Sequence, residues 1–124
     1  MNYDNKYYLG DDELSKERID NFLGESNKEE YNILLAHNPR HFEGYADWGA
    51  DLTLAGHVHG GMVRLPFIGG IFSPDTFLFP EYSSGLYEIE ESKLVVNRGL
   101  GKGRRGFRLF NQPELGVITL GTDV

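Results

Sequence analysis

Short apolar runs separated by polar or glycine-rich stretches follow one another along the chain, and most are long enough for one strand or one short helix. Leu14, Ile19 and Leu23 recur at roughly helical spacing behind an acidic stretch, which predicts a helix over residues 12–23. Gly24 follows directly, and glycine is the residue that most often ends a helix.

Two mainly apolar runs lie on either side of a helix-start signal in the middle of the chain. The sequences ILLA and DLTLA predict buried strands over residues 32–36 and 51–55. Between them, Asn38 can cap a helix whose first residue is Pro39, so a short helix is expected towards Trp48. Strand, helix and strand in this order predict an α/β fold in which the two strands are adjacent and parallel.

The second half of the chain is rich in turns. Residues 56–80 hold five glycines and three prolines, which predicts a long loop, and such loops usually serve a function. Four further short runs are strand candidates, of which the first two form a hairpin: 86–89, 94–97, 107–110 and 117–120.

Composition narrows the chemistry that the chain can perform. Its 124 residues carry a formal net charge of −7, which disfavours general binding to nucleic acids. The absence of cysteine excludes disulfides, thiolate metal sites and a cysteine nucleophile. No apolar run approaches the roughly 20 residues that span a bilayer, and no signal peptide is visible. Five basic and no acidic residues lie between Arg98 and Arg108.

Three histidines follow the two apolar strands. His37 comes directly after ILLA, and His57 and His59 come after DLTLAG. Open α/β sheets place ligand sites at the carboxyl ends of their strands, so these imidazoles are expected at one edge. A single histidine such as His37 is more often structural, whereas the pair in GHVHGG favours a metal site. His41 lacks this context and is interpreted as a structural residue.

These residues resemble a known family. The segments NILLAHNP and DLTLAGHVHGG, followed by GLYEIE, LVVNRGLG, FRLF and PELGVITL, resemble the C-terminal part of the calcineurin-like metallophosphoesterases, nearest to a bacterial branch of predicted phosphohydrolases. The resemblance implies that residues 1–124 are the C-terminal portion of an αββα sandwich whose N-terminal half is absent. It also implies a bacterial protein, cytoplasmic or membrane-associated, although the sequence itself does not give a localisation.

The resemblance further implies a dinuclear metal centre. His37 and His57 would bind one divalent ion and His59 the other, and imidazole ligands suit Mn, Fe, Zn or Co. Arg98 is the candidate for binding substrate phosphate. The family's Asp-x-His, Gly-Asp and Asn-His motifs do not occur here. The catalytic residues are therefore unknown, the general acid is expected in the missing half, and the chain alone should be inactive.

Two other interpretations remain open at this level. The histidines could hold one structural ion in a non-catalytic metal-binding or interaction module. A hydrolase of the amidohydrolase type is the weaker alternative, because a barrel of about 250 residues does not fit this length. The substrate class expected by resemblance is a phosphorylated small molecule or a lipid-linked phosphate. Because the two buried strands need cover on both faces, we also expect an exposed apolar face or a homo-oligomer.

Overall fold

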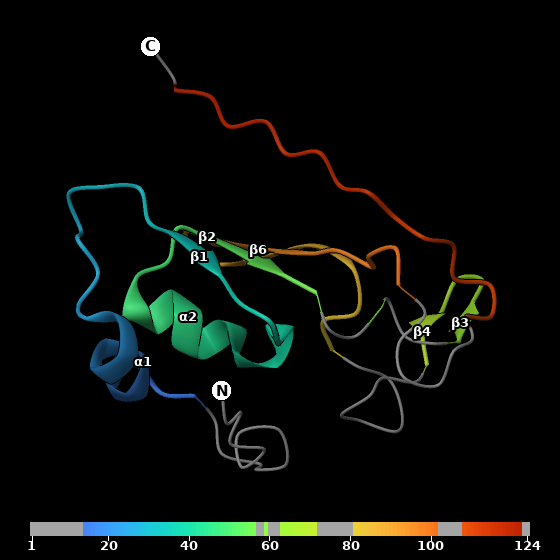
Figure 1. The fold of residues 1–124 in the computed structure, drawn as a ribbon, viewed down its shortest axis with the longest axis horizontal. Helices are drawn as coiled ribbons and strands as arrows, with labels where there is room; N and C mark the ends of the chain where they lie inside the picture. The colour runs from blue at the N-terminus through green and yellow to red at the C-terminus, as the bar shows by residue number, and fades with distance from the viewer. Residues whose placement is uncertain (1–13, 57–58, 60–62, 72–80, 102–107, 123–124) are drawn as a thin grey trace.

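The computed structural model describes residues 14–56, 59, 63–71, 81–101 and 108–122. These residues form a small α/β arrangement with a four-stranded sheet, two α-helices and a short 3₁₀ helix (Figure 1). In chain order the elements are α1 (Lys16–Leu23), β1 (Ile33–Leu35), η2 (Pro39–His41), α2 (Phe42–Trp48), β2 (Leu52–Ala55), β3 (Arg64–Leu65), β4 (Gly69–Gly70), β5 (Gly85–Ile89) and β6 (Ser92–Val96).

The sheet has the strand order β1-β2-β6-β5. Strand β2 is parallel to both β1 and β6, whereas β5 is antiparallel to β6. Leu34 lies opposite Thr53, and Thr53 lies opposite Leu94, so the three side chains share one face of the sheet. The predicted α/β class and the predicted parallel pairing of the first two strands are both confirmed.

The helices cover one face of this sheet (Figure 1). Under β2 and β6, Phe42 of α2 packs against Ala55, Leu94 and Val96, and these four residues form one buried cluster. A second cluster joins Ile19 of α1 to Tyr45 and Ala50, with Leu34 and Ala36 packed against it. Burial raises the pKa of Tyr45 to about 12, and its hydroxyl donates to the Asn38 carbonyl.

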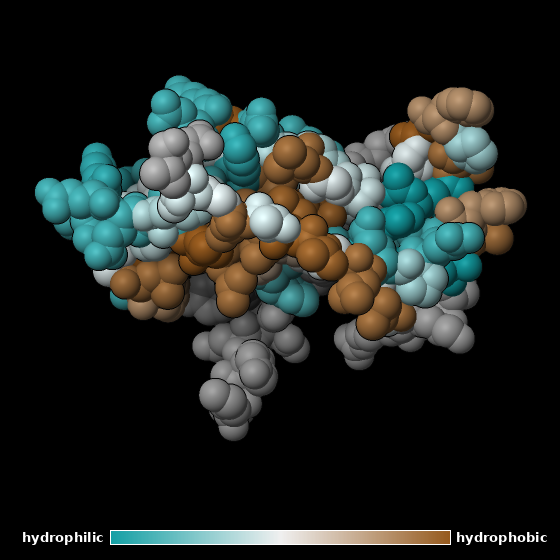
Figure 2. All heavy atoms as spheres, turned by 90° about the horizontal axis from the view of Figure 1, so that it is seen from above, coloured by the Kyte–Doolittle hydropathy of each residue, from teal (hydrophilic) through white to brown (hydrophobic). Residues whose placement is uncertain are grey.

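The opposite face of the sheet is apolar, and it is uncovered along the two edge strands, β1 and β5. The register assigns six apolar side chains to it, which together we call the open face: Ile33, Leu35, Leu52, Leu54, Leu86 and Val95. Figure 2, seen from the side away from the helices, shows apolar side chains running across the middle of the molecule. Leu35 is 78% exposed and Leu86 is 59% exposed. The expectation of an exposed apolar face is therefore met among the described residues.

Strand β1 is less buried than the run ILLA predicts. Ile33 is 48% exposed, whereas Leu52 of the neighbouring β2 is 4% exposed. The physical reason is position, because β1 is an edge strand and β2 lies inside the sheet. The prediction of a buried strand is thus correct for β2 and wrong for the outer face of β1.

Two of the helix boundaries predicted from local residues agree with the structure, and the start of α1 does not. Asn38 accepts a hydrogen bond from the Arg40 main-chain N–H at 3.0 Å, so the predicted cap before Pro39 is confirmed. Gly24 ends α1 with a φ of +82°, as expected. The helix begins later than predicted, because Ser15 occupies the N-cap position. Residues 12 and 13 lie outside the described residues.

The second half of the chain departs more from expectation. The hairpin turns over Glu90 and Glu91 alone, since Ile89 pairs with Ser92, so β6 starts two residues earlier than predicted. Two short strands, β3 and β4, pair within the expected loop.

Neither C-terminal run forms a predicted strand in the described residues. Leu109 makes only an isolated bridge to Val63, and residue 107 lies outside the described part. Residues 117–120 run away from the sheet (Figure 1), and Val117 is 87% exposed. This run is rich in β-branched residues, which favour a strand, but no described strand pairs with it.

Candidate functional site

Three parallel strands bring their carboxyl ends to one edge of the sheet, and the predicted site residues follow these ends. His37 lies two residues beyond β1, and its carbonyl accepts from the Gly56 N–H at 3.4 Å. Asn97, which follows β6, donates from its N–H to the Ala55 carbonyl at 2.9 Å. His57 comes directly after Gly56 but lies outside the described residues. The main chain of His37 therefore lies beside the segment that leads into His57.

His59 has a left-handed backbone conformation, with φ of +50°. Residues other than glycine seldom adopt this conformation. Its carbonyl accepts a short hydrogen bond from Asn111 Nδ2 and a longer one, at 3.4 Å, from Arg108 Nη2. Its ring lies against the loop after β6, because a Cβ built on Gly101 would be 3.7 Å from His59 Cε1. His59 is thus tied to residues that follow β6.

Arg108 donates hydrogen bonds to several main-chain carbonyls at this edge. Its Nη1 donates to Gly99 at 2.9 Å and to Gly101 at 2.7 Å. Its Nη2 also donates to the Arg98 carbonyl at 3.2 Å. Burial lowers the pKa of Arg108, and the nearby positive charge of Arg98 lowers it further. The guanidinium thus joins the Arg98–Gly101 loop to the main chain of His59.

Arg98 is held by Glu114. Oε2 of Glu114 accepts from the Arg98 N–H at 3.0 Å and from Nε at 3.2 Å, and Oε1 accepts from Nη2 at 3.3 Å. These bonds lower the pKa of Glu114, the side-chain bond most and the main-chain bond next. The guanidinium predicted to bind phosphate is therefore part of an ion pair at the same edge.

His41 has a different setting from the other described histidines. Its Nδ1 accepts from the Leu14 N–H at 3.3 Å, and its ring meets Tyr45 edge-on at 6.4 Å between centroids. These contacts tie α2 to the start of α1, in keeping with the structural interpretation.

The donor set at the strand ends suits a divalent transition metal. Neutral imidazoles with no thiolate are ligands for Zn, Fe, Mn or Co. Within the described residues, no group of three or more His, Asp or Glu side chains is gathered for a metal. Since His57 lies outside that part, the set of His37, His57 and His59 stays a prediction. The residues that are described fit it, because their main chains lie at the required edge.

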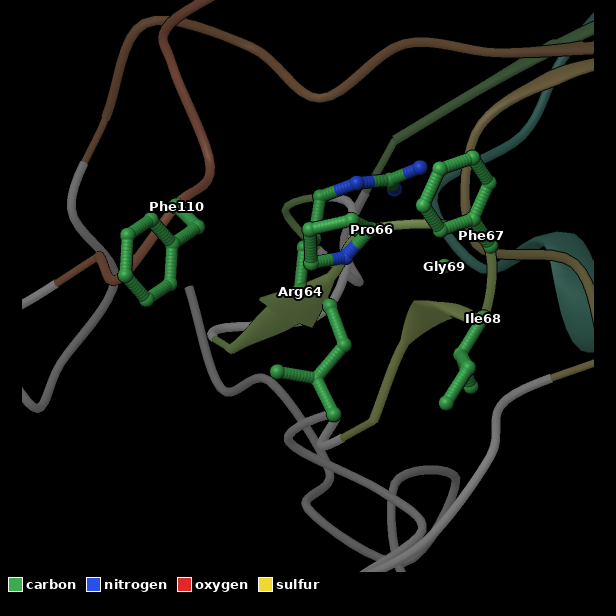
Figure 3. A pocket seen from close by; sticks show the side chains of 7 residues that line it. Arg64, Pro66, Phe67, Ile68, Gly69 and Phe110 are labelled. Carbon is green, nitrogen blue, oxygen red and sulfur yellow. The ribbon is translucent and has the colours of Figure 1, made fainter.

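A shallow hollow of about 530 Å³ lies elsewhere, on the β3–β4 hairpin. Figure 3 shows Arg64, Pro66, Phe67 and Ile68 around it, with Phe110 on its other side. Arg64 also donates to Ser84 Oγ at 2.9 Å. The hollow is lined by none of the predicted site residues, so it does not identify the site.

Sequence reasoning missed three residues of this edge: Arg108, Asn111 and Glu114. In the sequence Arg108 is distinguished only as one of five basic residues, and no periodic pattern marks the other two. The available signal was the resemblance itself, because LVVNRGLG, FRLF and PELGVITL contain Arg98, Arg108 and Glu114. The structure brings these three segments together through the hydrogen bonds described above.

Comparison with known proteins gives several bacterial relatives. The chain is 39% identical over 90 residues to the uncharacterized metallophosphoesterase YkuE of Bacillus subtilis, covering 73% of this chain and 31% of that protein. It is 38% identical over 88 residues to the phosphodiesterase YaeI of Escherichia coli, covering 71% and 32%. It is 36% identical over 92 residues to the UDP-2,3-diacylglucosamine pyrophosphatase LpxG of Chlamydia muridarum, covering 69% and 28%.

The chain spans about a third of the length of these relatives. No family model matches the sequence, and no solved structure matches it. Among the described residues, no helix has the length and apolar character needed to cross a membrane. The relatives' names are those of phosphoester or pyrophosphate hydrolases, and a metallophosphoesterase is metal-dependent by name. On the strength of these similarities, the chain belongs to the metallophosphoesterase family.

Proposed function

We propose that the chain supplies part of a dinuclear metal centre that hydrolyses phosphate mono- or diesters. The observation that carries this proposal is the convergence of His37, Gly56 and Arg98 at the carboxyl edge of three parallel strands. Ligand sites of open α/β sheets lie at this edge. The sequence places His57 next to Gly56, and His59 two residues later.

Each residue has a distinct part in the proposed site. His37 and His57 hold one divalent ion and His59 holds the other, and when bound the ions polarise a phosphoryl oxygen. Arg98 presents its guanidinium to a phosphate group. The planar guanidinium can donate two parallel hydrogen bonds to phosphate oxygens. Glu114 supports this role by holding the guanidinium through Nε and Nη2.

The same proposal includes a further polypeptide region that completes the site. The open face is apolar, and the C-terminal segment has exposed apolar residues such as Leu115 and Val117. Exposed apolar patches of this kind mark contact surfaces. We infer that another sheet layer covers the open face, brings the remaining metal ligands and supplies the general acid. On this account the 124 residues alone turn over a phosphodiester negligibly.

The substrate proposal is a phosphorylated small molecule or a lipid-linked phosphate. It is supported by the names of two relatives, a phosphodiesterase and a UDP-2,3-diacylglucosamine pyrophosphatase. The formal charge of −7 argues against nucleic acid as the substrate.

A chimera tests the proposed function. The segment of E. coli YaeI that matches this chain is replaced by the corresponding residues of the chain, and hydrolysis of bis(p-nitrophenyl) phosphate is measured with Mn²⁺. The proposal predicts turnover in the chimera, its loss in His57→Ala and its retention in His41→Ala. The isolated chain serves as the negative reference.

Two results would contradict the proposal. A folded, metal-loaded chimera without turnover would indicate a non-catalytic metal-binding module instead. Robust turnover by the isolated chain that disappears in His57→Ala would show that the site needs no further polypeptide.

A further inference from the structure

We propose that Asn111, held in place by Arg108, is a positioning residue that fixes the main chain of His59 and so orients its imidazole towards the metal. The inference rests on the proposed function, because it assigns the two residues a role towards a metal ligand. Neither residue is itself proposed to touch metal or substrate.

The first step is the contact between Asn111 and His59. Asn111 is 4% exposed, and its Nδ2 donates to the His59 carbonyl across 52 positions of the sequence. A buried side-chain amide without a partner is costly, so this bond fixes the two segments relative to each other. The amide therefore contacts the main chain of His59.

The second step is the support that Arg108 gives to Asn111. Arg108 Nη2 donates to Asn111 Oδ1 at 3.4 Å and to the His59 carbonyl at 3.4 Å. The same guanidinium holds Gly99 and Gly101, and Gly101 lies against the His59 ring. Arg108 thus holds both Asn111, which contacts the main chain of His59, and Gly101, which lies beside its ring.

The third step is the backbone conformation of His59. A φ of +50° is strained for histidine and persists only where surrounding contacts enforce it. The bonds from Asn111 and Arg108 to its carbonyl are such contacts. Residues that hydrogen-bond to a metal ligand fix its orientation. Their substitution typically lowers metal affinity about 10–100-fold.

The test is a Zn²⁺ titration of the full chain, followed by NMR of ¹⁵N-labelled histidine, in wild type and Asn111→Asp. The substitution keeps the side-chain shape and an acceptor for Arg108, but it removes the N–H that binds the His59 carbonyl. We expect the affinity read at the His59 ring to fall about 10–100-fold. We also expect the metal-free His59 amide resonance to move, which a purely metal-dependent effect would not cause.

The negative charge that Asn111→Asp adds should by itself raise zinc affinity, whereas loss of the contact to His59 should lower it. The direction of the change therefore separates the two effects. An added carboxylate near a cation site strengthens cation binding by its charge alone. Asn97→Asp is the matched control, because it adds the same charge nearby and keeps an oxygen to accept from the Gly99 N–H at 2.6 Å. We expect its zinc affinity to equal or exceed that of wild type. Arg108→Lys keeps the charge but loses the forked geometry, so it should weaken affinity less than Asn111→Asp.

The outcomes separate this inference from the proposed function. If the His59 ring of wild type does not respond to Zn²⁺, the metal site and this inference both fail. If wild type and Asn111→Asp respond with equal affinity, the inference alone fails and the proposed site stands. Weaker binding in both Asn111→Asp and Asn97→Asp would also overturn the inference, since the loss would then not be specific to the contact between Asn111 and His59. Thermal unfolding of each variant verifies that the fold is intact before the titration.

Discussion

Replacing Glu114 with glutamine should lower the free energy of unfolding by about 1–2 kcal/mol at neutral pH. Three donors of Arg98 converge on the two carboxylate oxygens, at 3.0, 3.2 and 3.3 Å. Glutamine keeps one carbonyl oxygen, but it loses the negative charge and places an NH₂ group near a guanidinium donor. The ion pair is therefore lost together with at least one hydrogen bond.

The magnitude follows from the exposure of the pair. Fully exposed ion pairs contribute roughly 0.2–1 kcal/mol, whereas hydrogen bonds to charged groups contribute about 1.5–3 kcal/mol. The side chains of Arg98 and Glu114 are 25% and 33% exposed, which lies between these cases. The control is Glu91→Gln, on the exposed hairpin turn, which should change stability by less than about 0.5 kcal/mol.

The pH dependence gives an independent check of the same contact. Arg98 lowers the pKa of Glu114, so the stabilisation is fully present above the ordinary glutamate pKa of about 4.3. It disappears as pH falls through the lowered pKa of the folded state, where the carboxylate is protonated. The difference between wild type and Glu114→Gln should therefore shrink from pH 7 to pH 3 in urea unfolding followed by circular dichroism. A difference of the same size at both pH values, or none at pH 7, would refute the reasoning.

Three further predictions concern the fold. Leu94→Ala should cost about 2–5 kcal/mol in urea unfolding because Leu94 is 0% exposed, whereas Leu35→Ala, at a position 78% exposed, should cost less than about 0.5 kcal/mol. Equal losses would contradict the assignment of the two sheet faces. Gly49→Ala should cost about 1–3 kcal/mol by the same measurement, because φ is +109° and the new Cβ would lie 2.5 Å from Ser26 Oγ. Light scattering should show association of the isolated chain with concentration, since the open face is apolar; a monodisperse monomer that binds no hydrophobic dye would contradict this.

Local signals in the sequence account for the features that were predicted correctly. The run DLTLA and the pair Asn38-Pro39 act over a few residues, and each fixes one element or one helix start. The parallel pairing then follows, because a strand, a helix and a strand connected in this order return to the same sheet direction. His37 and the segment leading into His57 reach one edge for the same reason.

Contacts between distant residues account for what was missed. Asn111 meets His59 across 52 positions, and Glu114 meets Arg98 across 16 positions. Neither contact has a periodic signature, since each depends on how loops return to the edge of the sheet. The exposure of Leu35 was missed for a related reason, because an apolar run does not reveal that its strand lies at the sheet edge. The C-terminal run 117–120 has a strand pattern without a described partner strand.

The most direct test of the proposed metal centre compares all four histidines in one Zn²⁺ titration. The rings of ¹⁵N-labelled histidine report metal binding one by one, and His41 serves as the internal reference because its Nδ1 already accepts from Leu14. The account predicts that His37, His57 and His59 shift together at low zinc concentration while His41 does not. Equal shifts of all four rings, or a response that omits His37, His57 or His59, would contradict the claim that the strand ends form one dinuclear metal centre.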